Sequence, residues 1–200
     1  MERQISAKPR LTDRLPASLR RFLRGEDAAI VAEAVIVLPL LLWAYIGLFV
    51  YWDTFRTINT LQKATYTIAD MISRQQTGIN SSYVNGAQSV LDYLINDGTS
   101  SALRITSVTY SQANDRFEVH WSRTTDAARL PALTTISLQD HSSQIPVMTP
   151  GDYVVIVESI MPYTPAFNVG LSAQTFSQFV VTRPRFLPCI PMDNVSCPVT

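Results

Sequence analysis

The strongest pattern in the chain is an apolar run over residues 28–52, AAIVAEAVIVLPLLLWAYIGLFVYW, in which Glu33 is the only charged residue. An α-helix rises about 1.5 Å per residue, so about 20 apolar residues cross the hydrocarbon core of a bilayer. Lipid offers the backbone no hydrogen bonds, so a spanning segment is helical, and neighbouring helices allow it to tolerate Pro39 and Gly47. The pattern therefore predicts a transmembrane helix over residues 29–52.

Two alternatives to a membrane anchor are less favoured. A buried helix of a soluble domain seldom needs so long an unbroken apolar run. A cleavable secretory signal usually has an apolar region of about 7–15 residues followed by a small-x-small cleavage site. The run here ends in Phe-Val-Tyr-Trp-Asp over residues 49–53, which contains no such site. We therefore expect the helix to stay attached.

The helical pattern continues beyond residue 52. Between residues 53 and 76, apolar residues recur at a spacing of three or four and polar residues lie between them, which is typical of an amphipathic helix. The members of this stripe are Phe55, Ile58, Leu61, Ala64, Thr65, Ile68, Met71 and Ile72. After Gly47, neither Gly nor Pro occurs until Gly78. We expect one helix from about residue 28 to about residue 76, whose stripe faces the domain or sister subunits.

A second helix is expected after the turn at residues 78–82. Asn80, Ser81 and Ser82 are its candidate N-caps, and Asp97-Gly98 is the expected end. The apolar face of this helix consists of Val84, Ala87, Val90, Leu91, Leu94 and Ile95.

The period then changes to that of strands. Residues 103–110 and 116–123 are rich in β-branched and aromatic residues and predict a hairpin with a turn over residues 112–115. In its second strand, three apolar residues alternate with three polar residues, which predicts one apolar and one polar face. They are Phe117, Val119 and Trp121 against Glu118, His120 and Ser122.

The rest of the chain completes a small sheet. A loop with a short helix is expected over residues 126–152, and a covered central strand over residues 153–160. A loop bounded by Pro162 and Pro165 follows, and the last strand is expected over residues 175–182. The fold class is α+β: a long N-terminal transmembrane helix that continues into a domain with a second helix and a small antiparallel β-sheet.

Charge is uneven along the chain although the net charge is zero. Seven basic and four acidic residues precede Ala28, whereas nine basic and twelve acidic residues follow it. The positive-inside rule therefore keeps the basic end in the cytoplasm and sends the long C-terminal part across the membrane. The basic end is either an amphipathic helix on the membrane surface or a disordered tail. No basic cluster combines with an aromatic platform, so no nucleic-acid partner is expected.

These patterns divide the chain into four parts. They are a cytoplasmic basic leader over residues 1–28, the transmembrane helix over residues 29–52, an extension of that helix over residues 53–76, and an α+β domain over residues 77–200.

The sequence gives no sign of an enzyme. Of the two histidines, His120 is expected on the polar face of the hairpin and His141 in a polar loop. Asp140-His141-Ser142 contains the residue types of a catalytic triad, but adjacent residues cannot all converge on one site. No spacing suits a metal or a glycine-rich phosphate loop, so neither a metal nor a cofactor is expected.

Cys189 and Cys197 are the only cysteines, with seven residues between them. In an oxidising compartment two such neighbours favour a disulfide, which the chain-entropy model values at about 2–3 kcal/mol. Two separate thiols are the alternative.

Glu33 lies about one helical turn inside the apolar run. An unpaired carboxylate inside a membrane span costs about 3 kcal/mol, and such residues are often functional. The alternative is a side chain that snorkels to the cytoplasmic interface.

The segment RRFLRGEDAAIVAEAVIVLPLLL, residues 20–42, combines a basic leader, an acidic pair, a small residue and an apolar helix with Glu near its start and Pro after Val-Leu. In these features it resembles the start of the TadE/TadG-like proteins of the tight-adherence (Flp) pilus system. The resemblance is strongest over residues 22–74, where WDTFRTINTLQKATYTIADMISRQ is similar to members with a long periplasmic helix. YVVIVESIMPYTP and FVVTRPRF extend it more weakly into the C-terminal part.

The resemblance implies a minor pilin-like subunit or assembly factor of a bacterial pilus. Such a protein sits in the inner membrane with its N-terminus in the cytoplasm and a pilin-like domain in the periplasm, either in the pilus or at its base. Its implied partners are other pilin or pilus-assembly subunits, a prepilin peptidase and the membrane.

The alternative function is a single-pass, membrane-anchored periplasmic binding or sensor domain. A cleft lined by convergent polar groups would favour this alternative, whereas an open apolar stripe along residues 53–76 would favour assembly.

The resemblance also implies how the chain is processed. A prepilin peptidase cuts just before the apolar helix and leaves Glu at the fifth mature position. This rule places the cut between Ala28 and Ala29, where Ala28 replaces the usual Gly, and makes Glu33 the fifth residue. The new α-amino group is largely protonated at neutral pH and could pair with Glu33 of an adjacent subunit at low dielectric. Pro39 would then kink the helix or simply be tolerated in it.

Overall fold

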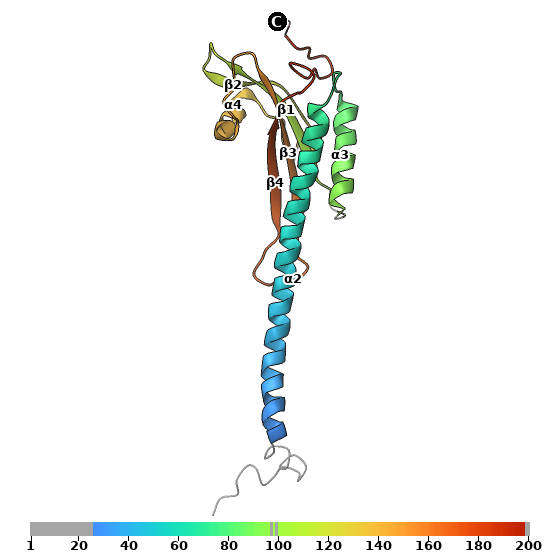
Figure 1. The fold of residues 1–200 in the computed structure, drawn as a ribbon, viewed down its shortest axis with the longest axis vertical. Coiled ribbons are helices and arrows are strands. Elements are labelled where there is room, and N and C mark those ends of the chain that lie inside the picture. Colours follow the sequence, from blue (N-terminus) through green and yellow to red (C-terminus); the bar gives the residue numbers. More distant parts are fainter. Residues whose placement is uncertain (1–25, 97, 99, 199–200) are drawn as a thin grey trace, which may run out of the picture. The chain divides into compact units, whose positions relative to one another are not determined.

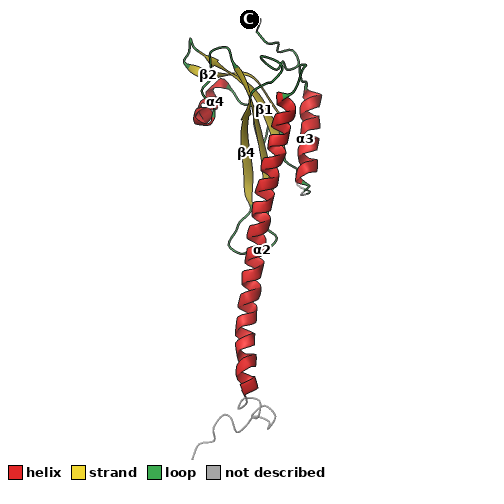
Figure 2. Ribbon diagram, in the orientation of Figure 1, coloured by secondary structure: helices red, strands yellow, loops and turns green. Residues whose placement is uncertain are grey.

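The computed structural model describes residues 26–96, 98 and 100–198, and for residues 26–29 the backbone alone (Figure 1). Most of the expected leader, residues 1–25, lies outside the described part. The chain forms two compact units, of which the first ends at Phe49 and the second begins at Val50. The fold class is α+β, with a long apolar N-terminal helix and a four-stranded antiparallel sheet (Figure 2). The elements are α2 (Glu26–Ser73), α3 (Ser81–Ile95), β1 (Ala102–Ser111), β2 (Arg116–Thr124), α4 (Thr135–Leu138), the 3-10 helix η2 (Gln139–Gln144), β3 (Tyr153–Tyr163) and β4 (Gln174–Thr182).

Helix α2 covers both the apolar run and the amphipathic stretch, and its helical backbone continues through Pro39. The helix ends at Ser73, a few residues before the predicted end at residue 76. A contact from far along the chain accounts for the difference, because the backbone N–H of Arg185 donates to the carbonyl of Ser73 at 2.8 Å. The chain that follows β4 thus closes the end of the helix.

The amphipathic stripe of α2 packs against the sheet of the same chain. Leu61, Ile68 and Ile72 are fully buried, and fully burying such a side chain contributes about 1.5–3 kcal/mol. The strand residues of the same core cluster are Leu103, Ile105, Trp121, Val155, Val157, Met161, Tyr163, Phe176 and Val180. Phe55 and Met71 stay 62% and 36% exposed. The stripe was expected to face either its own domain or sister subunits. Its own domain covers most of it.

Helix α3 begins where the sequence predicts and ends one residue early. The side chain of Asn80 accepts the N–H of Tyr83 at 2.8 Å, which satisfies one of the free donors at the helix start. Asn96 adopts a left-handed conformation, with φ 47°, and is the C-cap. The cap therefore stands just before the expected end at Asp97-Gly98, of which Asp97 lies outside the described residues, and Asn, like Gly, tolerates the left-handed conformation. Val84, Ala87, Leu91 and Ile95 are the buried residues of the predicted face.

The sheet has the strand order β2-β1-β3-β4 with antiparallel pairing throughout, and β3 is central as predicted. Strand β3 extends to Tyr163, so Pro162 pairs with Thr175 and does not belong to a loop. The pairing of β3 with β1 stops at Ile160, opposite Ala102. Beyond that point β3 is an edge strand, where proline is tolerated.

A β-bulge in β2 changes the faces that the alternation predicted. Ser107 pairs with Trp121 while Val108 pairs with Val119, so His120 is the extra residue. As a result Trp121 packs in the core cluster beneath α2, whereas Phe117 and Val119 pack against the cluster on the opposite face. The prediction that these three residues share one face is therefore wrong.

The opposite face of the sheet is covered by the segment between β2 and β3. This segment holds α4 and η2, as the predicted loop with a short helix requires. The buried residues of this second core cluster are Val108, Leu133, Leu138, Ile145, Met148, Val154 and Ile156. Because β3 is covered on both faces, its sequence is a continuous apolar run interrupted by few polar residues.

An ion pair is buried between this segment and the sheet. Arg104 of β1 and Glu158 of β3 are register partners and are only 6% and 7% exposed. The guanidinium Nε and Nη2 atoms donate to the two carboxylate oxygens at 2.6 and 2.7 Å. The Nη1 atom also donates to the carbonyl of Pro131. This bidentate geometry satisfies both charges, which a buried pair needs to be tolerated.

We predict that Glu158→Gln lowers the free energy of unfolding by about 3 kcal/mol, because the change leaves the buried Arg104 guanidinium without a compensating charge. The measurement is denaturant unfolding of the detergent-solubilised protein, followed by near-UV circular dichroism. Glu118→Gln is the matched control, since Glu118 pairs with Arg116 at the surface with N and O 3.3 Å apart and contributes less than about 1 kcal/mol. Equal losses in the two variants would contradict the prediction.

Candidate functional site

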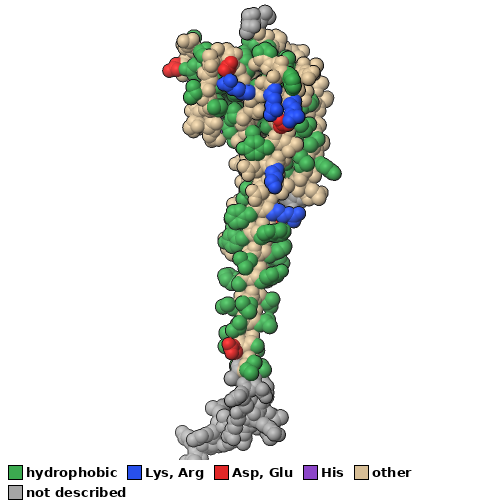
Figure 3. All heavy atoms as spheres, viewed as in Figure 1, with side chains coloured by type: hydrophobic (Ala, Val, Ile, Leu, Met, Phe, Trp, Pro, Cys, Tyr) green, Lys and Arg blue, Asp and Glu red, His purple; other side chains and the backbone are tan. Residues whose placement is uncertain are grey.

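The first unit exposes a continuous apolar helix surface. Between Ile30 and Phe49 the exposed large hydrophobic side chains of α2 are 40–72% exposed, and they cover the visible face of this section (Figure 3). Within the described residues, α2 is the one helix long and apolar enough to cross a membrane, with a mean hydropathy of 2.3 in its most apolar window. A helix that is apolar all round needs an apolar environment, so this section is compatible with a single-pass membrane anchor.

Three predicted site features lie at the start of this helix. Ala28 and Ala29 belong to its backbone, so the expected cleavage site has helical geometry. Glu33 is exposed, and none of the described residues forms a hydrogen bond or ion pair with it. Pro39 stands in the apolar section two turns further on. Glu33 is therefore a lone carboxylate on an apolar surface, and a partner for it has to come from outside the described chain or from the membrane interface.

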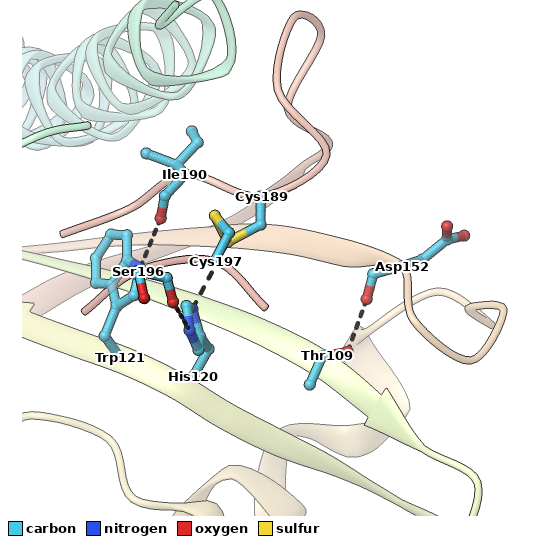
Figure 4. Close-up of a disulfide and its surroundings, with 8 residues drawn as sticks. All are labelled: Thr109, His120, Trp121, Asp152, Cys189, Ile190, Ser196 and Cys197. Atoms are coloured by element: carbon cyan, nitrogen blue, oxygen red, sulfur yellow. Dashed lines mark hydrogen bonds between the residues drawn. A yellow bond between two sulfur atoms is a disulfide. The ribbon is translucent and has the colours of Figure 1, made fainter. Parts of the chain in front are cut away.

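Cys189 and Cys197 belong to the second unit and lie at disulfide-bonding distance, with Cα atoms 5.8 Å apart (Figure 4). The residues from Cys189 to Cys197, which we call the C-terminal segment, cross β2 next to the bulge. Nε1 of Trp121 donates to the carbonyl of Ile190 at 2.8 Å, and Nε2 of His120 lies 3.2 Å from the carbonyl oxygen of Ser196. The expected disulfide thus sits over two neighbouring side chains that the bulge turns to the same face.

His120 differs from its expected place on a polar face. Its ring is half-buried, packs edge-on against Tyr153 with centroids 5.3 Å apart, and has Nδ1 3.8 Å from Sγ of Cys189. The strict alternation of a regular strand would have pointed this side chain away from the C-terminal segment. The bulge inserts one residue and brings it beneath that segment.

The same C-terminal segment holds the α2–α3 turn. The backbone N–H of Ile79 donates to the carbonyl of Pro191 at 2.9 Å, and the N–H of Asp193 donates back to the carbonyl of Ile79 at 3.0 Å. Ile190 and Met192 are fully buried in the core beneath α2. A Cβ atom at Gly78 would lie 3.3 Å from the Pro191 carbonyl oxygen, so this close approach favours glycine. The segment therefore joins the turn to the edge of the sheet.

A second candidate site is a cavity of about 270 Å³ on the face of the sheet opposite α2. The Arg104–Glu158 ion pair forms part of its wall. His141 of η2 also lines it, and its ring stacks on Phe179 with centroids 5.5 Å apart. Nδ1 of His141 is buried and has no hydrogen-bond partner among the described atoms. The cavity therefore gathers polar groups from three segments that are distant in sequence.

The sequence pattern does not predict this convergence. It indicates a polar loop for His141 and gives no role to Arg104 or Glu158. A signal for the ion pair was nevertheless present, because each of these charged residues interrupts an apolar strand, in ALRITSV and in YVVIVESIM. A charge that is buried in this way needs a partner of opposite sign. The position of His141 depends on how the segment between β2 and β3 folds back, which no local pattern specifies.

The segment that covers this cavity is fixed at its start by Asp126 and Arg129. Nε of Arg129 donates to Oδ2 of Asp126 at 2.5 Å, and Oδ1 accepts the backbone N–H groups of Arg129 and Ala128 at 3.1 and 3.0 Å. These hydrogen bonds, that of the Arg129 side chain foremost, hold the pKa of Asp126 below its usual range. The contribution of Asp126 to stability is therefore present at neutral pH and is lost as the pH falls through the lowered pKa.

In comparisons with known proteins, no family profile matches the chain, and no curated protein or solved structure shows significant similarity to it. In the described part of the chain, no group of three or more His, Cys, Asp or Glu side chains is placed to hold a metal ion. The candidate sites are therefore the apolar section of α2 with Glu33, the C-terminal segment and the cavity beside the ion pair.

We predict that Cys189 and Cys197 are joined in the protein recovered from an oxidising compartment. The denatured, unreduced protein should then take up no maleimide label, and the reduced protein should take up two labels, as measured by intact mass. Reduction should also destabilise the folded protein by about 2–3 kcal/mol, because an open loop has more conformational entropy when unfolded. Labelling of both cysteines before reduction would contradict the disulfide.

Proposed function

We propose that this protein is a minor pilin-like subunit or assembly factor of a Tad/Flp-type pilus. In this proposal α2 anchors it in the bacterial inner membrane, and the α+β domain lies in the periplasm. The observation that carries the proposal is the unbroken helix α2, in which an exposed apolar section with one carboxylate is followed by an amphipathic section packed beneath a four-stranded sheet. This order of features agrees with the resemblance of residues 22–74 to TadE/TadG-like proteins.

The amphipathic stripe of α2 is already covered, and this limits which surface of the protein can contact other subunits. Leu61, Ile68 and Ile72 already pack against the chain's own sheet, so they offer no contact to a sister subunit. Helix packing between subunits would instead use the exposed section between Ile30 and Phe49. Between helices in lipid, close packing and polar contacts drive association, since the lipid tails are as apolar as the side chains.

Glu33 is the polar group available on that section. After cleavage between Ala28 and Ala29, the charged α-amino group of one subunit would pair with Glu33 of its neighbour. An attraction of this kind is strong at low dielectric, and it would fix the stagger between adjacent helices. The absence of a partner for Glu33 among the described residues is what this mechanism requires.

A second candidate function is a single-pass, membrane-anchored periplasmic binding or sensor domain. The cavity beside Arg104 and Glu158 favours it, because a buried ion pair, the unpartnered Nδ1 of His141 and a stacked aromatic ring meet there. In this function the apolar section of α2 would serve only as an anchor.

The first prediction from the proposed function concerns the N-terminus of the mature chain. Protein recovered from its native membrane should begin at Ala29, because the peptidase would leave Glu33 as the fifth residue. Intact mass and N-terminal sequencing measure this directly. A chain that still begins at Met1 would contradict processing, make Glu33 an interfacial residue and favour the binding or sensor domain.

The second prediction concerns Glu33→Gln. The variant should insert into the membrane as the wild type does, but its incorporation into the pilus fraction should fall about tenfold, because a charge-assisted contact is lost. The two quantities are measured by membrane fractionation and by immunoblotting of sheared pili. Glu118→Gln, which alters a surface carboxylate of the hairpin, is the control. Equal loss of insertion and incorporation in Glu33→Gln would count against the pairing.

A further inference from the structure

A polar groove lies between α2 and the C-terminal end of α3, inside the second unit. Its volume is about 330 Å³. The lining residues are Asp53, Arg56, Thr57 and Thr60 of α2, with Leu94, Ile95 and Asn96 at the end of α3. Asp53 follows the apolar run directly in sequence, and the exposed aromatic residues Trp52 and Phe55 flank it. Aromatic residues of this kind are enriched at the level of lipid headgroups.

One side of the groove is positive. The guanidinium carbon of Arg56 lies 5.6 Å from the ring centroid of Trp52, a cation–π contact that positions the side chain. Arg56 is exposed and forms no ion pair with any described acid, including Asp53. The hydroxyl of Thr57, one residue on, forms no hydrogen bond within the described part of the chain. A guanidinium and a neighbouring hydroxyl are the donors that a phosphate group prefers.

The other side of the groove attracts a cation. Oδ2 of Asp53 accepts the hydroxyl hydrogen of Tyr163 at 2.9 Å, which leaves Oδ1 as an acceptor. The last carbonyls of α3 lack intrahelical partners and carry the negative end of the helix dipole. No basic residue stands in the last turn of α3 to neutralise them. A carboxylate and a helix C-terminus thus face the same groove.

We infer that this groove binds the headgroup of a phospholipid that carries both a phosphate and a primary ammonium, as in phosphatidylethanolamine. Asp53 and Arg56 are three residues apart on one helix, so their Cβ atoms are about 5–6 Å apart, a spacing that a two-carbon ethanolamine bridge can match. The phosphate would contact Arg56 and Thr57, and the ammonium would donate to Asp53 and the end of α3. The inference rests on the proposed membrane anchorage, which puts Asp53 at headgroup level.

The test compares three lipids with identical acyl chains. The full-length protein in detergent is titrated with phosphatidylethanolamine, phosphatidylcholine or phosphatidylglycerol, and bound lipid is counted by native mass spectrometry. Phosphatidylethanolamine should bind about tenfold more tightly than phosphatidylcholine, because a primary ammonium has three N–H donors and choline has none. Equal binding of these two lipids, or tightest binding of the anionic phosphatidylglycerol, would overturn the inference.

Two variants separate the two halves of the groove. Asp53→Asn should remove the preference for ethanolamine over choline while keeping an acceptor for the Tyr163 hydroxyl. Arg56→Gln should weaken the binding of phosphatidylethanolamine about tenfold, since a charge-assisted phosphate contact is lost. Arg116→Gln, which alters an exposed arginine of the hairpin, is the control and should bind as the wild type does. Wild-type binding by Arg56→Gln would also overturn the inference.

Membrane anchorage is measured separately by alkaline carbonate extraction of native membranes. Protein that stays in the membrane pellet but shows no lipid preference would overturn the headgroup site alone. Protein that is released into the supernatant would overturn the proposed anchorage, and the headgroup site with it.

Discussion

The packing of the second half of α2 against one face of the sheet is the interaction on which the rest of the fold depends. A long helix gains most of its stability from tertiary contacts of one face, and here those contacts begin at Val50. From that residue on, buried positions follow helical spacing through Leu61 and Ile68 to Ile72. Before it, the large hydrophobic side chains described are exposed, apart from the half-buried Ile46, so one helix presents two kinds of surface in succession.

Both faces of the sheet are covered, one by the helices α2 and α3 and the other by the segment between β2 and β3. Polar side chains of the sheet are therefore buried and need hydrogen-bond partners. On the face of the sheet that packs against α2, the hydroxyl oxygens of Thr65 and Ser159 lie 2.6 Å apart and form a buried hydrogen bond. The opposite side holds the bidentate pair of Arg104 and Glu158. Within the described structure, two buried polar side-chain atoms have no hydrogen-bond partner: Oγ of Ser107, and Nδ1 of His141, which is an exception at the edge of the cavity. Such an exception is a reason to regard the cavity as a binding site.

Periodicity predicted the type and order of the elements well, because α3 and the second half of α2 bury one face at helical spacing and β3 is a nearly continuous apolar run. The end of α3 was missed locally, because Asn96 adopts the left-handed conformation before Gly98. The bulge at His120 and the place of Pro162 in β3 were not predictable, since each depends on pairing with another strand. The cavity escaped prediction for the same reason. The roles of Ala28, Ala29 and Glu33 concern contacts between chains, so they stay predictions, and the kink at Pro39 does too.

The position of the C-terminal segment has a consequence for the order of folding. Ile190 accepts the indole N–H of Trp121 from 69 residues away, and Ile190 and Met192 complete the core beneath α2. The hairpin of β1 and β2 can form early from local contacts, whereas this core stays open until residue 192 has been synthesised. A nascent chain of this protein therefore keeps the apolar surface beneath this segment exposed until residue 192 has been added.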